Sequence, residues 1–399
     1  MDWPTIYMVA DARRAISLSI FTFTFVSQTT QYRGEVVYIY AFDVAYGIKR
    51  EPLNLLLGHP VEQFAVDASK RNPRQLFFYR PQMVRLPPME RAGPRGAMRV
   101  ERTVKLLPVG ALSITVRVPF EASNIRDLVD YHDLTFGDGA VLLDEVTELA
   151  QKVCAELGDH LIRPLPNLAA EEAYTVFCIA SPLVGPDGAC LNAENWLRAN
   201  RRDVAALLTQ ETDGDHLAQQ ESDESTSLRL SYYDHDIAVM DWDAALLMDE
   251  PANFDESLYI MELANLQLAE LEAYDRILDD SLERAYRDMR IRPIRSRRAV
   301  LGDLREIRID LARLGDELSN ITKFFGDWHL ARLYQGLSAR FHLADWHRTI
   351  DEKLKTLDEL YELLNQERMN RWMLTLEITI VLLFVIDLVM LFFGMHAHF

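Results

Sequence analysis

The apolar stretch near the end of the chain, from Trp372 to Phe393, constrains the fold more than any other feature. It reads WMLTLEITIVLLFVIDLVMLFF, close to the ~20 apolar residues that a helix needs to cross a bilayer. Its large apolar residues contribute about −7 kcal/mol to insertion, whereas an acid at the centre of a span costs about 2.5–3.5 kcal/mol. Even with two acids, Glu377 and Asp387, the balance narrowly favours insertion. We therefore predict a single C-terminal transmembrane helix, against the alternative of a helix buried in a soluble core.

The two acids inside this predicted span need an explanation of their own. The side chain of Asp387 is too short to carry its carboxylate far toward the interface, so we expect it to be protonated or partnered. Three interpretations of Glu377 and Asp387 stay open. They join helices in a homo-oligomer, they form a proton or ion site, or they are tolerated at a thin or deformed edge of the bilayer.

The two ends of the chain predict its orientation. The N-terminal sequence MDWPTIYMVADARR carries acids and no apolar core before a cleavage site, unlike a secretory signal or a transit peptide. Arg368 and Arg371 precede the span, whereas residues 394–399 contain no Lys or Arg. The positive-inside rule then places the bulk of the chain in the cytosol. We expect a tail-anchored protein of the cytoplasmic (inner) membrane, with the lipid bilayer as a partner.

Charge, cysteines and missing motifs exclude several classes of protein. The 399 residues carry a net charge of −19, so only a local basic patch could bind nucleic acid. The three cysteines show no Cys-x-x-Cys spacing, which argues for a reducing compartment and against a zinc knuckle. The sequence contains no nucleotide phosphate loop, no dinucleotide-binding glycine motif, no nucleophile elbow and no His-Glu-x-x-His. We therefore expect no cofactor and no enzymatic activity, although distant residues can still assemble an active site.

The first 250 residues alternate between strand-like and helix-like patterns. Strands are predicted at Glu35–Gly47, Gln75–Arg85, Ala111–Val118, Ala173–Ala180, Leu228–Tyr233 and Ile237–Met248. Helices are predicted at Ile125–His132, Ala140–Leu157 and Trp196–Leu208. Prolines and glycines predict a loop between the second and third strands, and a polar run predicts another at Gln210–Ser227. The fold class is therefore α+β, beginning with a mixed α/β domain.

After Pro251 the apolar residues take up helical spacing. From Leu304 to Phe325 they recur three and four residues apart, and the pattern resumes from Leu343 to Leu364 with Lys353 at one apolar position. This spacing predicts a long antiparallel or coiled-coil helical stalk, within one chain or between copies. The predicted domains are 1–250 for the sheet domain, 251–371 for the stalk, 372–393 for the transmembrane helix and 394–399 for a short tail.

The stretch from Asn320 to Phe393 resembles the C-terminal half of the "required for meiotic nuclear division" family, which has bacterial and mitochondrial members. The matching features are Trp328, Leu333-Tyr334, Arg340, the run Asp351–Leu354, Leu376-Glu377 at the membrane entry and the second acid, Asp387. The resemblance covers roughly the last fifth of the chain. It implies a membrane-anchored protein, in a family whose eukaryotic members are associated with support of mitochondrial translation. It supplies no catalytic residues.

A basic run stands out in this acidic chain around Pro293. It consists of Arg284, Arg287, Arg290, Arg292, Arg295, Arg297 and Arg298. Such a cluster can contact RNA or a ribosome through phosphates, or bind anionic lipid head groups. It can equally be a solvated turn whose arginines pair with acids of neighbouring helices. These alternatives remain open.

Two groups of potential metal ligands were weighed. Asp234, Asp236, Asp241 and Asp243 supply oxygen ligands, but they lack the spacing and glycine of an EF-hand loop. We interpret them as two turn residues and two solvent-facing strand residues. His396 and His398 are too few to hold a metal by themselves. The sequence therefore predicts no metal site.

Together these patterns predict a non-enzymatic, membrane-anchored scaffold that faces the cytosol and forms homo-oligomers. By the family resemblance, it would support translation, with ribosome or RNA contact through the basic run. The alternative is an oligomeric ion channel or transporter subunit that uses the acids of the span. Gly394-Met395 after the span also occurs in bacterial magnesium channels, but His396 stands where those channels have Asn.

Overall fold

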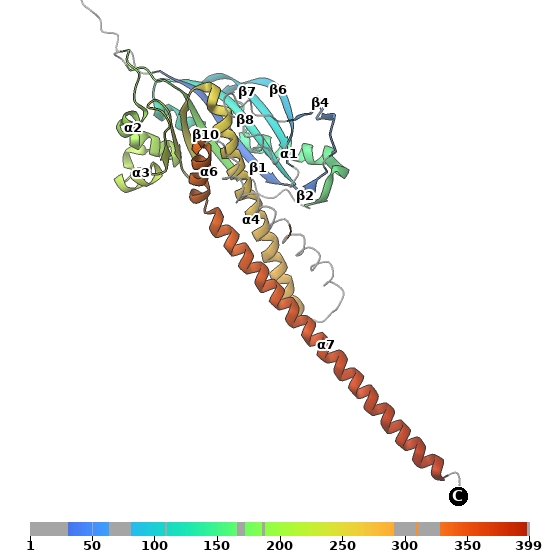
Figure 1. Cartoon of the computed structure of the whole chain (residues 1–399). Coiled ribbons are helices and arrows are strands. Elements are labelled where there is room, and N and C mark those ends of the chain that lie inside the picture. The colour runs from blue at the N-terminus through green and yellow to red at the C-terminus, as the bar shows by residue number, and fades with distance from the viewer. Residues whose placement is uncertain are drawn as a thin grey trace, which may run out of the picture.

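The structure is a computed structural model that describes residues 31–49, 51–63, 81–107, 110–165, 172–185, 188–290, 309 and 328–396. A nine-stranded sheet lies at one end of the molecule, with helices on both faces. Long helices leave the sheet, and the last one continues alone to the C-terminal end of the described chain (Figure 1). The described part thus has the predicted mixed α/β sheet domain followed by helices, one of them apolar enough to span a membrane.

The sheet has the strand order β11-β12-β13-β10-β1-β8-β7-β6-β5. In that order the strands are Arg229–Leu230, Ile237–Met240, Ala244–Asp249, Glu172–Ala180, Tyr32–Asp43, Ala111–Ala122, Gly96–Leu106, Gln82–Gly93 and Glu62–Gln63. Neighbouring strands are antiparallel except β10 and β13, which are parallel. Two small pairs flank the sheet, β2 (Ala45–Ile48) with β9 (Leu161–Pro164) and β3 (Leu55–Leu56) with β4 (His59–Pro60).

The central strand β1 is apolar on both faces because each face meets a different core. Val36, Tyr38 and Phe42 point into the core on one side, and Val37 and Ile39 point into the core on the other. Successive side chains of a strand alternate between the faces of a sheet. A strand covered on both faces therefore shows a nearly continuous apolar run rather than a clean alternation.

Helices that follow β8 and β10 in the chain cover the first face. They are η1 (Ile125–Tyr131), α1 (Leu142–Leu157) and α2 (Ala193–Leu208), with η2 (Gly158–His160), η3 (Gly214–His216) and α3 (Gln219–Ser225) beside them. Asn124 and Asn192 cap η1 and α2, because each side-chain oxygen accepts a bond from a backbone N–H of the first turn. The three predicted helices of this region are confirmed, with α2 beginning three residues earlier than predicted.

The second face is covered by α4 (Phe254–Arg290), which follows the short η4 (Pro251–Asn253), by α6 (Trp328–Arg340) and by the first turns of α7 (Leu343–His396). In Figure 1, α4 and α7 run side by side away from the sheet in the same direction. The two long helices of the described chain are thus parallel rather than antiparallel. The heptad segment 304–325 lies outside the described residues, apart from Ile309, so a coiled coil stays a prediction.

Three predicted elements differ from those in the structure. The expected proline-rich loop is instead a hairpin of β6 and β7, where Pro87 and Pro88 fall at a shift in register between Leu86 and Met89. Proline is tolerated at such an irregularity because no ladder hydrogen bond is required there. The single strand predicted at Ile237–Met248 is the hairpin of β12 and β13, and the polar run at Gln210–Ser227 contains η3 and α3.

Candidate functional site

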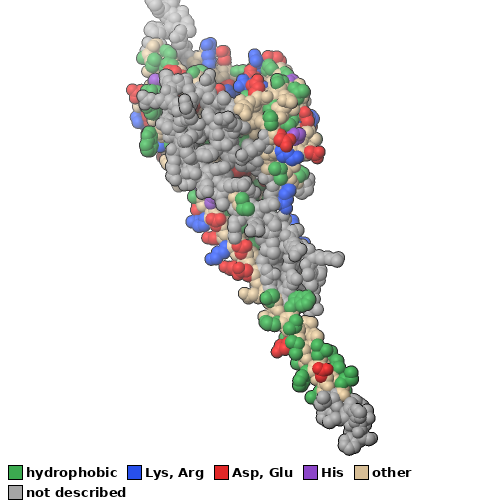
Figure 2. Space-filling model, turned by 45° about the vertical axis from the view of Figure 1, so that its right-hand side comes forward, with side chains coloured by type: hydrophobic (Ala, Val, Ile, Leu, Met, Phe, Trp, Pro, Cys, Tyr) green, Lys and Arg blue, Asp and Glu red, His purple; other side chains and the backbone are tan. Residues whose placement is uncertain are grey.

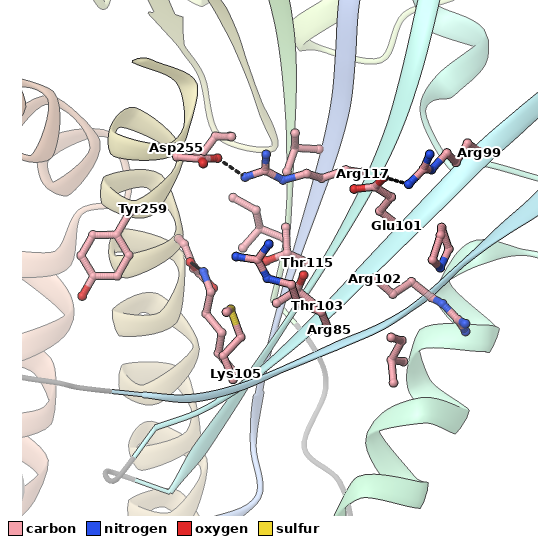
Figure 3. A pocket seen from close by; sticks show the side chains of 17 residues that line it. Arg85, Arg99, Glu101, Arg102, Thr103, Lys105, Thr115, Arg117, Asp255 and Tyr259 are labelled. Carbon is pink, nitrogen blue, oxygen red and sulfur yellow. Dashed lines mark hydrogen bonds and ion pairs between the residues drawn. The ribbon is translucent and has the colours of Figure 1, made fainter. Parts of the chain in front are cut away.

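A groove lies between the first turns of α4 and the strands β6, β7 and β8, and encloses a cavity of about 290 Å³ (Figure 3). Its apolar lining includes Ile39, Met83, Leu86 and Leu258. Its polar lining consists of Arg85, Arg99, Glu101, Thr103, Lys105, Thr115, Arg117, Asp255 and Glu262. Arg102 also lines it, but its side chain extends away from Arg85 and Thr115 (Figure 3).

Strand register places the polar residues of the groove in rows across the sheet. Thr103 on β7 is opposite Arg85 on β6 and Thr115 on β8, and Thr115 is opposite Ile39 on β1. Side chains directly opposite each other on antiparallel strands lie about 4.5–5.5 Å apart at their Cβ atoms. Arg85, Thr103 and Thr115 therefore meet at the centre of the groove, between Lys105 and Arg117 (Figure 3).

One cation of the groove joins the sheet to the start of α4. Arg117 contacts Glu35 at 3.3 Å and Asp255 at 2.5 Å. Burial raises the pKa of the Glu35 carboxyl, and the positive charge of Arg117 opposes that rise. This network fixes the first turn of α4 against β1 and β8.

A second cation lies deeper. Lys105 forms an ion pair with Glu262 of α4, and Ser113 donates a hydrogen bond to the other oxygen of that carboxylate. The side chains of Lys105 and Glu262 are only 10% and 8% exposed. Arg99 at the outer end contacts Glu101 at 2.8 Å, with both side chains about half exposed. Each of these cations therefore has a carboxylate of its own.

Arg85 differs from Arg99, Lys105 and Arg117. The described part of the chain contains no ion-pair partner for its guanidinium, although the side chain is exposed. The Thr115 hydroxyl is buried, and its oxygen has no hydrogen-bond partner among the described residues. The groove thus combines an unpaired guanidinium with an unsatisfied hydroxyl, an arrangement suited to binding an oxyanion.

The groove was not predicted from the sequence, although a signal for it exists. Glu101, Thr103 and Lys105 alternate with Val100 and Val104 along β7, so the polar residues share one face. Ser113, Thr115 and Arg117 repeat this alternation on β8. Two adjacent strands with matched polar faces, beside a strand that is apolar on both faces, indicate a polar site on that side of the sheet.

The predicted span lies in the last part of α7, where Trp372–Met390 has a mean hydropathy of 2.4 and no buried portion. Hydrophobic side chains surround the helix there, with acids among them (Figure 2). Glu377 and Asp387 are both exposed, and ten residues separate them, which turns Asp387 by roughly 80° around the axis. The structure brings neither acid near another described element, so their role stays a prediction.

The basic run lies mostly outside the described residues, which exclude Arg292, Arg295, Arg297 and Arg298. Arg284 and Arg287 are exposed near the end of α4, and Arg290 is its last residue. Arg287 contacts Glu283 one turn earlier at 3.1 Å. That contact fits a solvated helix face, and it leaves the binding interpretation untested.

The four aspartates near the end of the sheet domain have structural roles at two positions. Asp236 is buried and accepts bonds from the backbone N–H groups of Tyr232 and Tyr233 at 2.6 and 2.9 Å. Asp241 is buried and forms an ion pair with Arg340 at the end of α6. The prediction that two of the four face solvent from a strand is wrong for Asp241, because it begins the turn between β12 and β13. Within the described ranges, no three His, Cys, Asp or Glu side chains converge as metal ligands.

Comparison with known proteins assigns the sheet domain to a family. The family model described as "Uncharacterized protein MJ0711, N-terminal domain" matches residues 33–255, from β1 to the start of α4. A similar protein is the uncharacterized protein MJ0711 of Methanocaldococcus jannaschii, which is 23% identical over 239 residues, 59% of this chain and 71% of that protein. No solved structure matches. The family model thus covers the sheet domain, whereas the resemblance to the meiotic nuclear division family concerns residues 320–393.

Proposed function

The chain belongs to the family of the uncharacterized protein MJ0711 N-terminal domain, and on that premise we propose that it is a non-enzymatic, membrane-anchored scaffold. The sheet domain presents binding surfaces at a fixed distance from the bilayer, and the last part of α7 anchors it. The bulk of the chain faces the cytosol at the cytoplasmic (inner) membrane, by the arginines that precede the span.

The continuity of α7 is the observation that carries this proposal. The helix runs without a break from Leu343 to His396, over 54 residues. Its first turns are buried against the sheet domain, where Leu343, Ile350 and Leu357 join the second core. Its segment from Trp372 to Met390 is exposed and apolar. One rigid element therefore connects a packed domain to a segment that water does not favour.

Truncation tests the anchor. The full chain is expected to stay with membranes after an alkaline carbonate wash, and a chain that ends at Arg371 is expected in the soluble fraction. A chain that lacks only residues 394–399 keeps the span and serves as the matched control. Recovery of the shorter chain in washed membranes would show that another segment holds the protein there.

We propose that the partner belongs to the translation machinery, which the C-terminal resemblance supports. The basic run would then contact ribosomal RNA or a ribosome surface. Pull-down from crosslinked membranes tests this, with a variant in which Arg284, Arg287, Arg290 and Arg292 become Gln. Loss of ribosomal proteins in the variant supports the proposal, and their equal recovery from both chains contradicts the role of the arginines.

A second candidate, an oligomeric channel or transporter subunit, is favoured by the two exposed acids of the span. In hydrocarbon an acid is stabilised when helices of several copies pack together. Asp387→Leu is expected to weaken such an assembly, measured as the oligomeric state in detergent. An unchanged assembly would remove Asp387 from the interface, and ion flux in vesicles containing the purified protein would separate a channel from a scaffold.

A further inference from the structure

The charges of the groove do not cancel, which is unexpected in a chain of net charge −19. Three cations, Arg99, Lys105 and Arg117, each contact carboxylates within or beside the groove. Arg85 remains as a positive charge that no described carboxylate neutralises. A cation at the mouth of a concave, partly apolar site raises the local concentration of anions.

The Thr115 hydroxyl points to the same kind of ligand. Thr115 is 8% exposed, and its Oγ1 atom has no partner in the part of the chain that the structure describes. Leaving a buried hydroxyl unsatisfied costs about 1–3 kcal/mol, so valine would be the more stable choice at a purely structural position. Arg85, Thr103 and Thr115 lie opposite one another on the neighbouring strands β6, β7 and β8, on the same face of the sheet. An anion bound over these residues would supply the missing acceptor.

The size and the apolar lining of the groove limit the group that is attached to the acid of the ligand. Its volume of about 290 Å³ lies near the lower end of small-molecule pockets, which span roughly 300–1,000 Å³. Met83, Leu86, Ile39 and Leu258 line it beside the polar residues. A ligand that fits therefore has a small apolar body attached to an acidic group.

The position of the groove excludes a lipid head group of the anchoring membrane. Tyr259 lines the groove and precedes Asp275 by 16 positions on α4. Lys353 of α7 contacts Asp275 at 2.6 Å and precedes Trp372 by 19 positions. At ~1.5 Å per residue these intervals amount to about 50 Å along the two parallel helices. The ligand must therefore come from solution.

We infer that this groove binds a small soluble organic anion, whose carboxylate or phosphate group is held by Arg85 and the Thr115 hydroxyl and whose apolar part contacts Met83, Leu86 and Leu258. This site goes beyond the scaffold role. It makes the sheet domain a sensor or carrier of a small acid, and it stands whether or not the protein tethers a partner.

Binding of defined probes tests the inference on the full chain in detergent micelles. Benzoate and phenyl phosphate share an apolar ring and differ in the acidic group, and benzyl alcohol has the ring without a charge. Binding of either anion, measured by isothermal titration, is expected to weaken as salt concentration rises. The tighter of the two identifies the acidic group. Failure of both to bind at millimolar concentration, or equal binding of benzyl alcohol, overturns the inference.

Two substitutions locate the site. Arg85→Gln is expected to weaken binding of the better probe about 10- to 100-fold, as for the loss of a hydrogen bond to a charged group. Arg33→Gln is the matched control, because it removes a guanidinium from β1 that already contacts Glu121 at 3.3 Å. Equal affinity in the Arg85 and Arg33 variants would place the anion elsewhere and overturn the assignment.

Thr115→Val separates a ligand role from a structural one. The unliganded variant is expected to melt at the same temperature as the wild type or higher, because it loses an unsatisfied hydroxyl. Its affinity for the better probe should fall by about tenfold. A lower melting temperature together with unchanged affinity would mean that the hydroxyl serves the fold, and it would remove Thr115 from the site.

Discussion

Lys105 and Glu262 show how much a single buried pair contributes to the join between β7 and α4. Both side chains are nearly buried, and Ser113 satisfies the second oxygen of the carboxylate. Removing one member of a buried pair leaves the other charged in a low-dielectric site, which costs about 3–5 kcal/mol. We predict that Lys105→Met lowers the free energy of unfolding in urea by about this amount.

The double variant Lys105→Met with Glu262→Gln is the control for that prediction. The amide oxygen of Gln can still accept the bond from Ser113, and no charge remains buried. Most of the lost stability should return. If the single and double variants unfold at the same urea concentration, the penalty comes from lost packing of the lysine stem rather than from the charge.

Two partly buried carboxyl groups make the stability of the protein depend on pH. Burial, followed by a hydrogen bond with Glu272, raises the pKa of Glu172 to about 8, and burial raises the pKa of Asp43 to about 7. In the unfolded chain the pKa of Glu172 is about 4.5. A carboxyl whose pKa is higher in the folded protein contributes its full stabilisation below the unfolded pKa, and this contribution is lost as the pH rises through the folded pKa. We predict that the melting temperature falls between pH 5 and pH 9, and that Glu172→Gln makes this fall smaller. Parallel pH profiles for the two proteins would contradict the assignment to Glu172.

Residue patterns predict which side chains are polar but not which ones meet. The alternation of Glu101, Thr103 and Lys105 is visible in the sequence, yet the carboxylate that pairs with Lys105 lies 157 residues further along the chain. Only the packing of α4 across β1 brings the two together. Local rules for capping work better, because Asn124 and the helix that it caps are neighbours.

At the scale of elements, Lys353 explains the one charged position in an otherwise apolar helical repeat. On α7 it contacts Asp275 at 2.6 Å and Asp279 at 2.7 Å, both on α4. Removing the partner of a largely buried polar group costs about 1–3 kcal/mol. We predict that Lys353→Met lowers the free energy of unfolding in urea by about that amount. Lys355→Met, two residues away on the exposed side, should have no measurable effect.

Restoring the balance of charge checks this explanation. Asp275→Asn in the Lys353→Met background removes the less exposed of the two unpaired carboxylates. Stability should then recover by a large part of the initial loss. If the double variant is as unstable as Lys353→Met alone, then Lys353 stabilises the protein through the packing of its methylene groups.

Helices were easier to predict than hairpins. The spacing of Met261, Ala264, Leu268 and Leu271 identifies α4, because a face that packs on a sheet repeats with the helical period. Proline and glycine between two strands normally indicate a loop, and this rule failed at Pro87 and Pro88 because the hairpin absorbs them in an irregular register. The parallel pairing of β10 with β13 depends on the path of α2 and α3 between them, which no local pattern records.

In the whole molecule, the sheet domain lies far from the helix segment that is apolar enough to span a membrane. The sheet domain, which contains the groove, lies at one end, and the exposed apolar part of α7 lies toward the other (Figures 1 and 2). The sequence predicts this order of parts because each has its own periodicity. The helical spacing up to Leu364 also predicts that the last helix continues into the predicted span, but it does not predict that the first turns of this helix belong to the second core. The distance between that core and the predicted span is therefore a property of α7.

A break in α7 should therefore change the height of the sheet domain above the bilayer. Gln366 is exposed and lies between Leu357, which is fully buried, and Trp372. Proline at this position removes a backbone hydrogen bond and kinks the helix.

A donor dye on Cys190, which is exposed, can report the height of the sheet domain. The other two cysteines react poorly near neutral pH, because Cys178 is buried and burial raises the pKa of Cys154 to about 11. We predict that Gln366→Pro increases energy transfer from Cys190 to acceptor-labelled lipids in nanodiscs. The melting temperature of the sheet domain should not change, because the exposed position makes little contact with its core, and Gln366→Ala, which keeps the helix intact, should behave as the wild type. Equal transfer in the proline and alanine variants would show that contacts of the sheet domain with the bilayer, and not α7, set its height.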